Sequence, residues 1–167
     1  MIFRLSNNLK TRIGLDDLLE APVHANPFAD WSCHLFVAVR KQFILLTNTS
    51  SLYSCVMPAR GIIDGSFFVI RAIDTIRGFT ADDGKQLLYR KYIAPEIGKI
   101  SFAMPSDSSV IGSMTDHVMT AQQLLHGGMP ASEVGYRLNE TPMLALRRFV
   151  GRKSGIPKNA FAQMRDE

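Results

Sequence analysis

The sequence contains little cysteine and no long apolar run. Two of its 167 residues are cysteines, Cys33 and Cys55, and each lies among apolar neighbours. Their spacing is not that of a metal site, and a free cysteine in such surroundings usually acts as a small hydrophobic side chain. No apolar run approaches the roughly 18 residues of a membrane helix, and the N-terminal segment lacks the apolar core of a signal peptide. We therefore expect a cytoplasmic protein without disulfides and without membrane contact.

Motifs of the common enzyme classes are also missing. The sequence has no Walker loop, no G-x-G-x-x-G and no G-x-S-x-G around any serine. Its four histidines show no i, i+4 pair and no neighbouring set of carboxylates. We therefore expect no metal ion and no cofactor.

The composition is that of an ordinary globular protein, with 46% apolar and 20% charged residues. The length fits one domain. The net charge of +4 is concentrated at one end, because the last 31 residues hold seven Lys/Arg and three Asp/Glu whereas the first 136 hold twelve of each. We expect a single α+β domain over residues 1–150 and a basic, loosely held C-terminal tail over residues 151–167.

Alternating apolar residues in 31–40 and an apolar run at 43–46 predict two neighbouring strands. Arg40 and Lys41 lie between them and favour a β-hairpin. A two-residue loop there would place His34 opposite Thr47, and a three-residue loop would place it opposite Asn48. The sequence leaves both registers open. Residues 51–57 alternate again and predict a third strand.

The remaining chain predicts further strands at 2–5 and 99–104. Helical periodicity or capping signals predict helices at 66–78, 80–92, 108–126, 131–138 and 142–150. The order of these elements predicts an α+β fold. An antiparallel meander sheet from the N-terminal part would pack against helices from the middle and the C-terminal half.

A cluster of small polar residues follows the second strand of the hairpin. Thr47, Asn48 and Ser51 could form the rim of a binding site. A hydrolase-like enzyme could use His34 as its base, with this rim orienting the substrate. Turn chemistry alone would also explain residues 48–51, and we favour that structural interpretation.

The basic C-terminal segment raises a nucleic-acid hypothesis. Its candidate contacts are Arg147, Arg148, Arg152 and Lys153. Gly135 and Asn139 have the spacing of a helix-turn-helix. The second helix, however, begins with apolar residues where base-reading side chains would be needed, so two packed helices with a basic edge are favoured. Binding to nucleic acid would weaken steeply with salt.

Three blocks of the chain resemble a widespread bacterial family of small proteins of unknown function. They are Trp31-x3-Leu35 with the Arg40-Lys41 hairpin and L-x-T-N-x2-S-L-x-S, then S-V-I-G-S-M at 109–114, then L-N-E-T-P-M at 138–143. The resemblance covers the chain up to about residue 146 and implies no reaction. We expect a non-catalytic binding or regulatory domain. Its partner is unknown, with another protein or a second copy of the chain as open alternatives.

Overall fold

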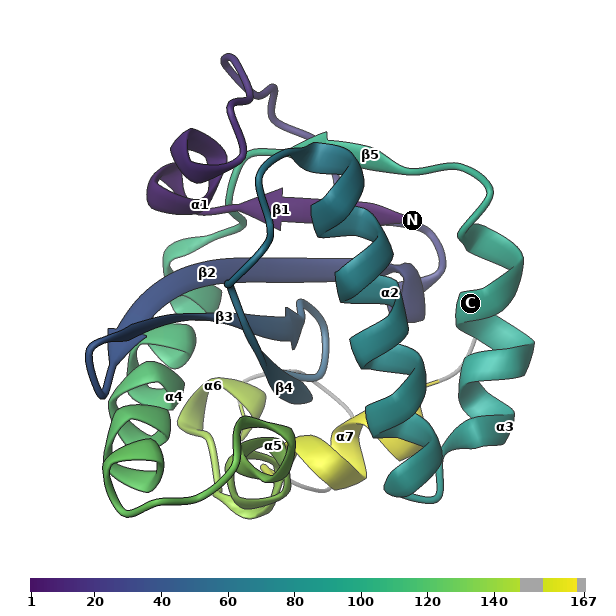
Figure 1. Cartoon of the computed structure of the whole chain (residues 1–167). Coiled ribbons are helices and arrows are strands. Elements are labelled where there is room, and N and C mark those ends of the chain that lie inside the picture. The colour runs from purple at the N-terminus through teal and green to yellow at the C-terminus, as the bar shows by residue number, and fades with distance from the viewer. Residues whose placement is uncertain (148–154, 165–167) are drawn as a thin grey trace.

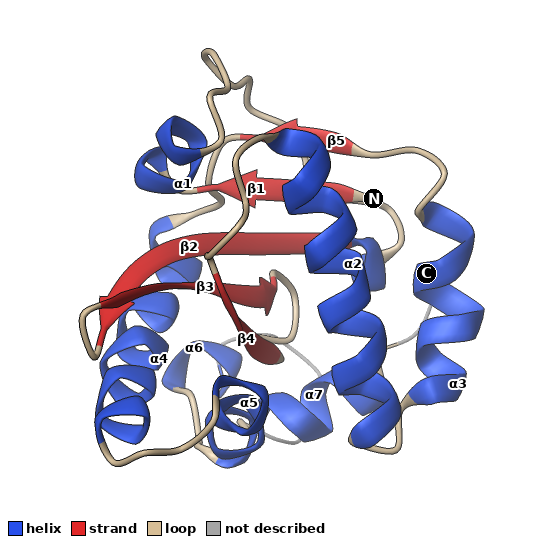
Figure 2. Ribbon diagram, in the orientation of Figure 1, coloured by secondary structure: helices blue, strands red, loops and turns tan. Residues whose placement is uncertain are grey.

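One five-stranded sheet forms the centre of the molecule (Figure 1). The computed structural model describes residues 1–147 and 155–164. The strands are β1 (Ile2–Leu5), β2 (Asp30–Ala38), β3 (Lys41–Asn48), β4 (Ser54–Pro58) and β5 (Ser101–Ala103). They lie in the order β4-β3-β2-β1-β5 (Figure 2).

The strands of this sheet do not all alternate in direction. β2, β3 and β4 pair antiparallel, whereas β1 pairs parallel with both β2 and β5. The α+β class is confirmed, but the predicted antiparallel meander is wrong because the sheet is mixed. The cause is the long connection over residues 6–29. It returns the chain to the end of the sheet at which β1 begins, so β2 runs in the same direction as β1.

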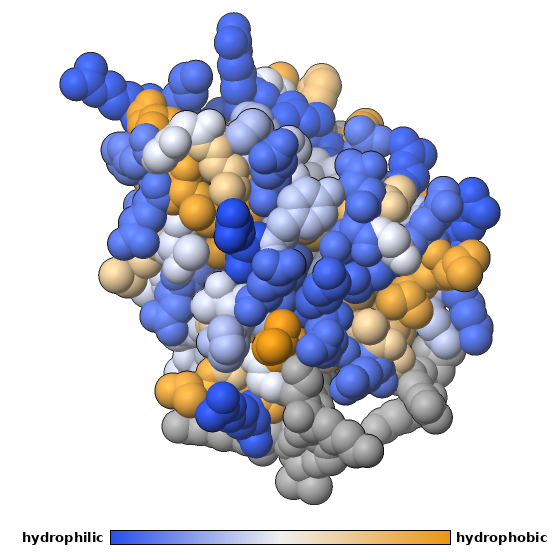
Figure 3. Space-filling model, turned by 90° about the horizontal axis from the view of Figure 1, so that it is seen from below, coloured by the Kyte–Doolittle hydropathy of each residue, from blue (hydrophilic) through white to orange (hydrophobic). Residues whose placement is uncertain are grey.

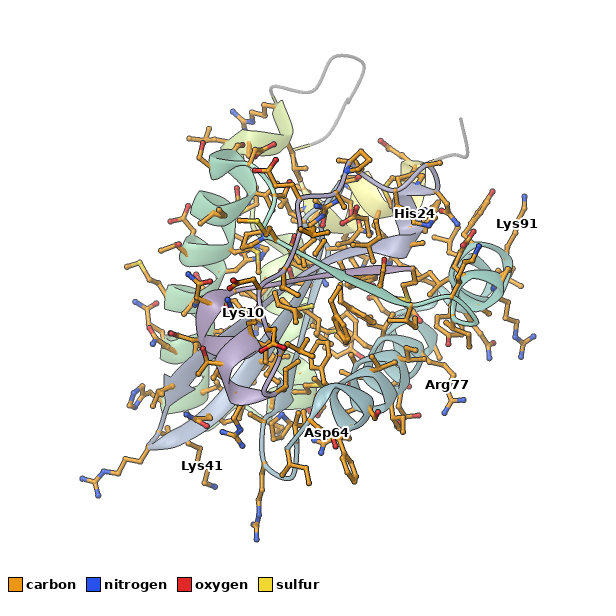
Figure 4. The ribbon with its side chains drawn as sticks, turned by 90° about the horizontal axis from the view of Figure 1, so that it is seen from above. Lys10, His24, Lys41, Asp64, Arg77 and Lys91 are labelled. Atoms are coloured by element: carbon orange, nitrogen blue, oxygen red, sulfur yellow. The ribbon has the colours of Figure 1, made fainter. Side chains whose placement is uncertain are left out.

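Helices cover both faces of the sheet. They are α1 (Asn7–Arg12), α2 (Gly65–Asp82), α3 (Gln86–Leu88), α4 (Ser108–His126), α5 (Ala131–Glu140), α6 (Leu144–Arg147) and α7 (Pro157–Gln163). Short 3-10 turns occupy η1 (Pro27–Ala29) and η3 (Ala94–Glu96), and a π-helical turn occupies η2 (Tyr89–Ile93). Seen from the β5 edge, α2 with Asp64 and Arg77 lies on one side of the strands and α4 lies on the other (Figure 4).

Two predicted helix boundaries are wrong, and at each of them a threonine hydroxyl bonds back to its own helix. The helix expected to end at Gly78 continues as α2 to Asp82, and Thr80 Oγ1 donates to the carbonyl of Ile76 at 2.7 Å and does not cap a new helix. Thr141 Oγ1 likewise donates to the carbonyl of Arg137 at 2.9 Å. It therefore closes α5 and does not start the next helix.

Each face of the sheet has its own apolar core. On the α2 side, Trp31, Cys33 and Leu46 pack with α1, α2, η2 and Phe161 of α7. On the α4 side, Phe36 and Leu45 pack with α4, α5 and α6. Burial on both faces explains the continuous apolar run in β3.

The hairpin between β2 and β3 turns at Val39 and Arg40, one residue earlier than expected. Both residues have positive φ, 45° and 60°, as a two-residue turn of type I′ requires. Ala38 then pairs with Lys41, and Phe36 stacks on Phe43 with ring centroids 5.8 Å apart. The predicted registers differ from this one.

Helix α5 closes the free edge of β4. The amide of Asn139 bonds to Ser54 twice: its Oδ1 accepts from the backbone N–H at 2.7 Å and its Nδ2 donates to the carbonyl at 2.9 Å. One turn earlier, Gly135 lies so close that a Cβ there would be 2.7 Å from the carbonyl oxygen of Ser54. The spacing that suggested a helix-turn-helix thus serves close packing of α5 on the sheet.

The segment expected to be a loosely held tail contributes one element to the core. Phe161 of α7 is fully buried. Its ring stacks on Tyr53 with centroids 4.2 Å apart and meets Phe28 and Trp31 edge-on. The end of the described chain is therefore packed against the same core as β2.

Candidate functional site

His34 lies on β2, on the face covered by α4, and is partly buried. Its partner across the hairpin is Leu45, so both predicted registers, opposite Thr47 or opposite Asn48, are wrong. Burial lowers the pKa of His34 below its ordinary value, and the imidazole is therefore neutral at pH 7.

The predicted rim residues do not form a surface with His34. Thr47, Asn48 and Ser51 are all fully buried. Thr47 shares a face with His34 and pairs with Ser32, whereas Asn48 pairs with Trp31 on the other face. The side chain of Asn48 therefore points away from the side chain of His34. The hydrolase arrangement of His34 with all three residues is therefore not formed.

Asn48 organises the turn between β3 and β4. Its Oδ1 accepts from the N–H and from the hydroxyl of Ser51, at 3.0 and 2.8 Å. Its Nδ2 donates to the carbonyls of Pro27 and Asp30, at 2.9 and 3.2 Å. The full hydrogen-bonding capacity of the amide is thus used inside the protein, as the structural interpretation of this cluster requires.

A serine–histidine pair joins β4 to α4 and was not predicted. Ser54 Oγ and His117 Nδ1 are 3.0 Å apart. Ser54 Oγ also donates to the carbonyl of Leu52 at 2.9 Å. Its single proton is therefore used there, and His117 Nδ1 must donate to Ser54. A histidine that donates to a serine cannot accept its proton, and both side chains are buried, so this pair lacks the features of a nucleophile and base.

His117 has an unusual environment for an imidazole. Its side chain is 2% exposed, and Nε2 has no hydrogen-bond partner among the described residues. Burial lowers its pKa to about 4. With the proton on Nδ1, the unpaired Nε2 is an acceptor, which costs less free energy when buried than an unpaired N–H. His117 is thus a neutral core residue at pH 7.

A pocket opens where β1 and β2 meet the first half of α4. Its volume is about 190 Å³, and most of its surface is apolar. The residues that line it come from the strands, from α4 and from two loops: Arg4, Ser32, Cys33, His34, Val110, Ile111, Met114, Thr115, Ser6, Asn7, Pro105 and Ser106. Of the predicted site residues in the described part of the chain, His34 lines this pocket.

A buried ion pair holds Arg4, one of the residues that line the pocket. Arg4 and Asp30 are 3% and 0% exposed, and the guanidinium binds both carboxylate oxygens at 2.8 Å. Arg4 also donates to the carbonyls of Ala21 and Pro22, both at 2.9 Å. The pair therefore fixes the loop over residues 15–26 against the sheet.

Thr49 extends this network toward the pocket. Its Oγ1 donates to Asp30 Oδ1 at 2.8 Å and lies 2.8 Å from Ser32 Oγ. The sequence analysis did not select Arg4, Asp30 or Ser32. A charged residue inside the apolar strand Ile2–Leu5 was a signal for a buried partner, but the partner is 26 residues away and only the parallel pairing of β1 with β2 brings it near.

The basic residues at the C-terminal end are only partly described. Arg147 ends α6 and is exposed. Arg148, Arg152 and Lys153 lie outside the described residues, so the nucleic-acid hypothesis stays a prediction. Residues 1–147 and 155–164 contain no group of three or more His, Cys, Asp or Glu that could hold a metal ion. No helix in the described ranges is long and apolar enough to cross a membrane.

Comparison with known proteins gives one match. The model of a family described as a domain of unknown function, DUF6933, matches residues 2–153. No curated protein and no solved structure matches the chain. The bacterial origin implied by the resemblance and the cytoplasmic location stay predictions. Because the matched segment is most of the chain, this protein belongs to the DUF6933 family, a domain of unknown function.

Proposed function

We propose that this protein is a non-catalytic ligand-binding domain, and that the pocket between β1, β2 and α4 is its binding site. The observation that carries the proposal is the combination of apolar walls with buried polar groups in one concavity of about 190 Å³. Small-molecule sites typically have this character: mostly apolar lining and a few fixed polar groups that orient the ligand.

The rigidity of the wall supports this assignment. Arg4 is held by Asp30 and by two carbonyls, and Ser32 is held by Thr49. Groups fixed in this way lose little conformational entropy when a ligand binds. His34 contributes an imidazole that forms no hydrogen bond with other described residues, so its ring nitrogens can bind a ligand.

A test needs a variant that fills the pocket and a control that does not. Ile111 lines the pocket and is 46% exposed, so Ile111→Trp adds bulk at its mouth without opening the core. Ile70 is an exposed isoleucine of α2, on the other side of the sheet. Ile70→Trp is therefore the matched control.

Methyl NMR spectra recorded with a set of small aromatic compounds would detect occupancy. We expect members of the set to shift the Met114 methyl signal in the wild type and in Ile70→Trp. In Ile111→Trp we expect the affinities to fall at least tenfold. Shifts that persist at full strength in Ile111→Trp, or a Met114 signal that no compound moves, would contradict the proposed function.

A further inference from the structure

Thr49 fixes the direction of the hydrogen bond made by Ser32, which lines the pocket. The hydroxyl of Thr49 has one proton, which goes to Asp30 Oδ1 because a carboxylate can only accept. The 2.8 Å contact between Thr49 and Ser32 must therefore use the proton of Ser32. Ser32 is 4% exposed, and with its proton directed away it offers only lone pairs to the pocket.

The same wall carries no net charge. Arg4 and Asp30 neutralise each other through two bonds of 2.8 Å. Both oxygens of Asp30 are fully engaged, since they also accept from Thr49 and from the N–H of His24. His34 is uncharged at pH 7 and offers one donor and one acceptor. An anion entering the pocket therefore meets a neutralised guanidinium and, at Ser32, an acceptor.

The opposite wall and the size of the pocket limit the ligand further. Val110, Ile111 and Met114 of α4 provide an apolar surface across from the strands. The volume of about 190 Å³ slightly exceeds the roughly 150 Å³ of an apolar protein cavity that holds benzene. A single ring with one or two substituent atoms fits such a space.

We propose that the pocket binds a neutral molecule of single-ring size that places its apolar side against α4 and a hydroxyl or N–H donor against Ser32. This rests on the proposed function, because it assumes that the pocket is a binding site. It adds the charge, the size and the hydrogen-bond direction of the ligand.

Three aromatic probes separate these properties: toluene and phenol, which are equal in size, and benzoate, which is slightly larger and carries a negative charge. Their affinities are measured by the Met114 methyl shift at pH 7.5. We expect phenol to bind roughly three- to tenfold more tightly than toluene, because one neutral hydrogen bond contributes about this factor to affinity. We expect benzoate to bind more weakly than phenol. Tightest binding by benzoate, or equal binding of phenol and toluene, would overturn this inference and leave the proposed function intact. If none of the three probes moves the signal, both fail.

Two variants test the role of Ser32 directly. Ser32→Ala removes the acceptor, so phenol should lose its advantage over toluene while toluene binds as before. Thr49→Val removes the group that takes the proton of Ser32 and does not line the pocket. The freed proton can then point into the pocket, and benzoate should gain affinity relative to phenol.

A matched serine variant separates this role from a structural one. Ser113 is a buried serine of α4 that donates to the carbonyl of Ser109 and does not line the pocket. Ser113→Ala should leave all three affinities unchanged. If Ser32→Ala lowers the affinities of all three probes equally, Ser32 only maintains the shape of the pocket and the proposed hydrogen bond is refuted.

Discussion

Two buried polar side chains, Asn48 and His117, differ in how completely the fold satisfies them. The amide of Asn48 uses both N–H donors and accepts twice through Oδ1. His117 makes one hydrogen bond and leaves Nε2 unpaired among the described residues. Asn48 therefore stabilises the fold at any ordinary pH, whereas His117 makes stability depend on pH.

The pH dependence due to His117 has a definite direction. Its pKa is about 4 in the folded protein and about 6.5 in an unfolded chain. Between these values the unfolded state binds the extra proton, so the free energy of unfolding falls as pH decreases from about 6.5 to about 4. The loss should reach about 3 kcal/mol at pH 4, since one pKa unit is worth about 1.4 kcal/mol.

Urea denaturation of the wild type and of His117→Leu at several pH values would measure this effect. The difference in pH dependence between the two proteins is the contribution of His117. His126 is exposed at the end of the same helix, and His126→Gln is the matched histidine control. An identical slope in His117→Leu would show that the imidazole is not the titrating group.

At the scale of secondary-structure elements, the contact between α5 and β4 depends on a missing side chain. A Cβ on Gly135 would lie 2.6 Å from Cζ of Phe79 and 2.7 Å from the carbonyl oxygen of Ser54. The second of these is backbone and cannot rotate away. The helix would have to move off the strand, which would also stretch the two bonds of Asn139.

We therefore expect Gly135→Ala to lower the free energy of unfolding by about 2 to 3 kcal/mol. Gly112 is the matched control, because it also lies inside a helix but a Cβ there would meet nothing within 4 Å. Gly112→Ala should raise stability by about 0.5 to 1 kcal/mol through helix propensity. Chemical denaturation of both variants gives the comparison, and equal effects would argue against the close contact.

The elements show which parts of the fold the sequence could predict. Alternation located β2, and a continuous apolar run located β3, whose two faces each meet a core. The register was missed because the expected two-residue loop lies one residue later than the observed one. This difference shifts the pairing of the strands by two residues and leaves every side chain on its own face. The observed loop is distinguished from the expected one by the positive φ of Val39 and Arg40. Neither valine nor arginine is a residue type that predicts positive φ.

The candidate site was less predictable than the strands. His34 could be selected because it is a titratable residue on a strand. The direction of β1 could not be predicted from Ile2–Leu5, since four residues pair as well parallel as antiparallel. Arg4, Asp30 and Ser32 belong together only in the parallel arrangement, so the polar end of the pocket depends on a long-range pairing.

At the scale of the whole molecule, α7 joins the end of the described chain to the central core. Phe161 contacts Phe28 and Trp31, which lie in the continuous segment of η1 and β2, and Tyr53, which precedes β4. On the surface, the face in Figure 3 is mostly hydrophilic, with hydrophobic residues in small groups. The burial of Phe161 thus attaches α7 to the central core, although the composition of this segment suggested a loosely held tail.

Phe161→Ala should destabilise the whole protein by about 3 to 5 kcal/mol, the usual cost of removing a fully buried phenylalanine. Phe67 of α2 is 48% exposed, and Phe67→Ala should cost clearly less. Thermal unfolding followed by circular dichroism would compare the two. A small effect at Phe161 would mean that α7 detaches from an otherwise intact domain.

The contact between α5 and β4 also affects how copies of this protein can associate. An exposed edge strand is a template on which another chain can add its own strand. Ser54 is occupied on its outer side by Asn139, and Pro58 has no N–H while its carbonyl accepts from Arg71 at 3.0 Å. Growth of a continuous intermolecular sheet from this edge, the first step toward a fibril, therefore requires α5 to detach first.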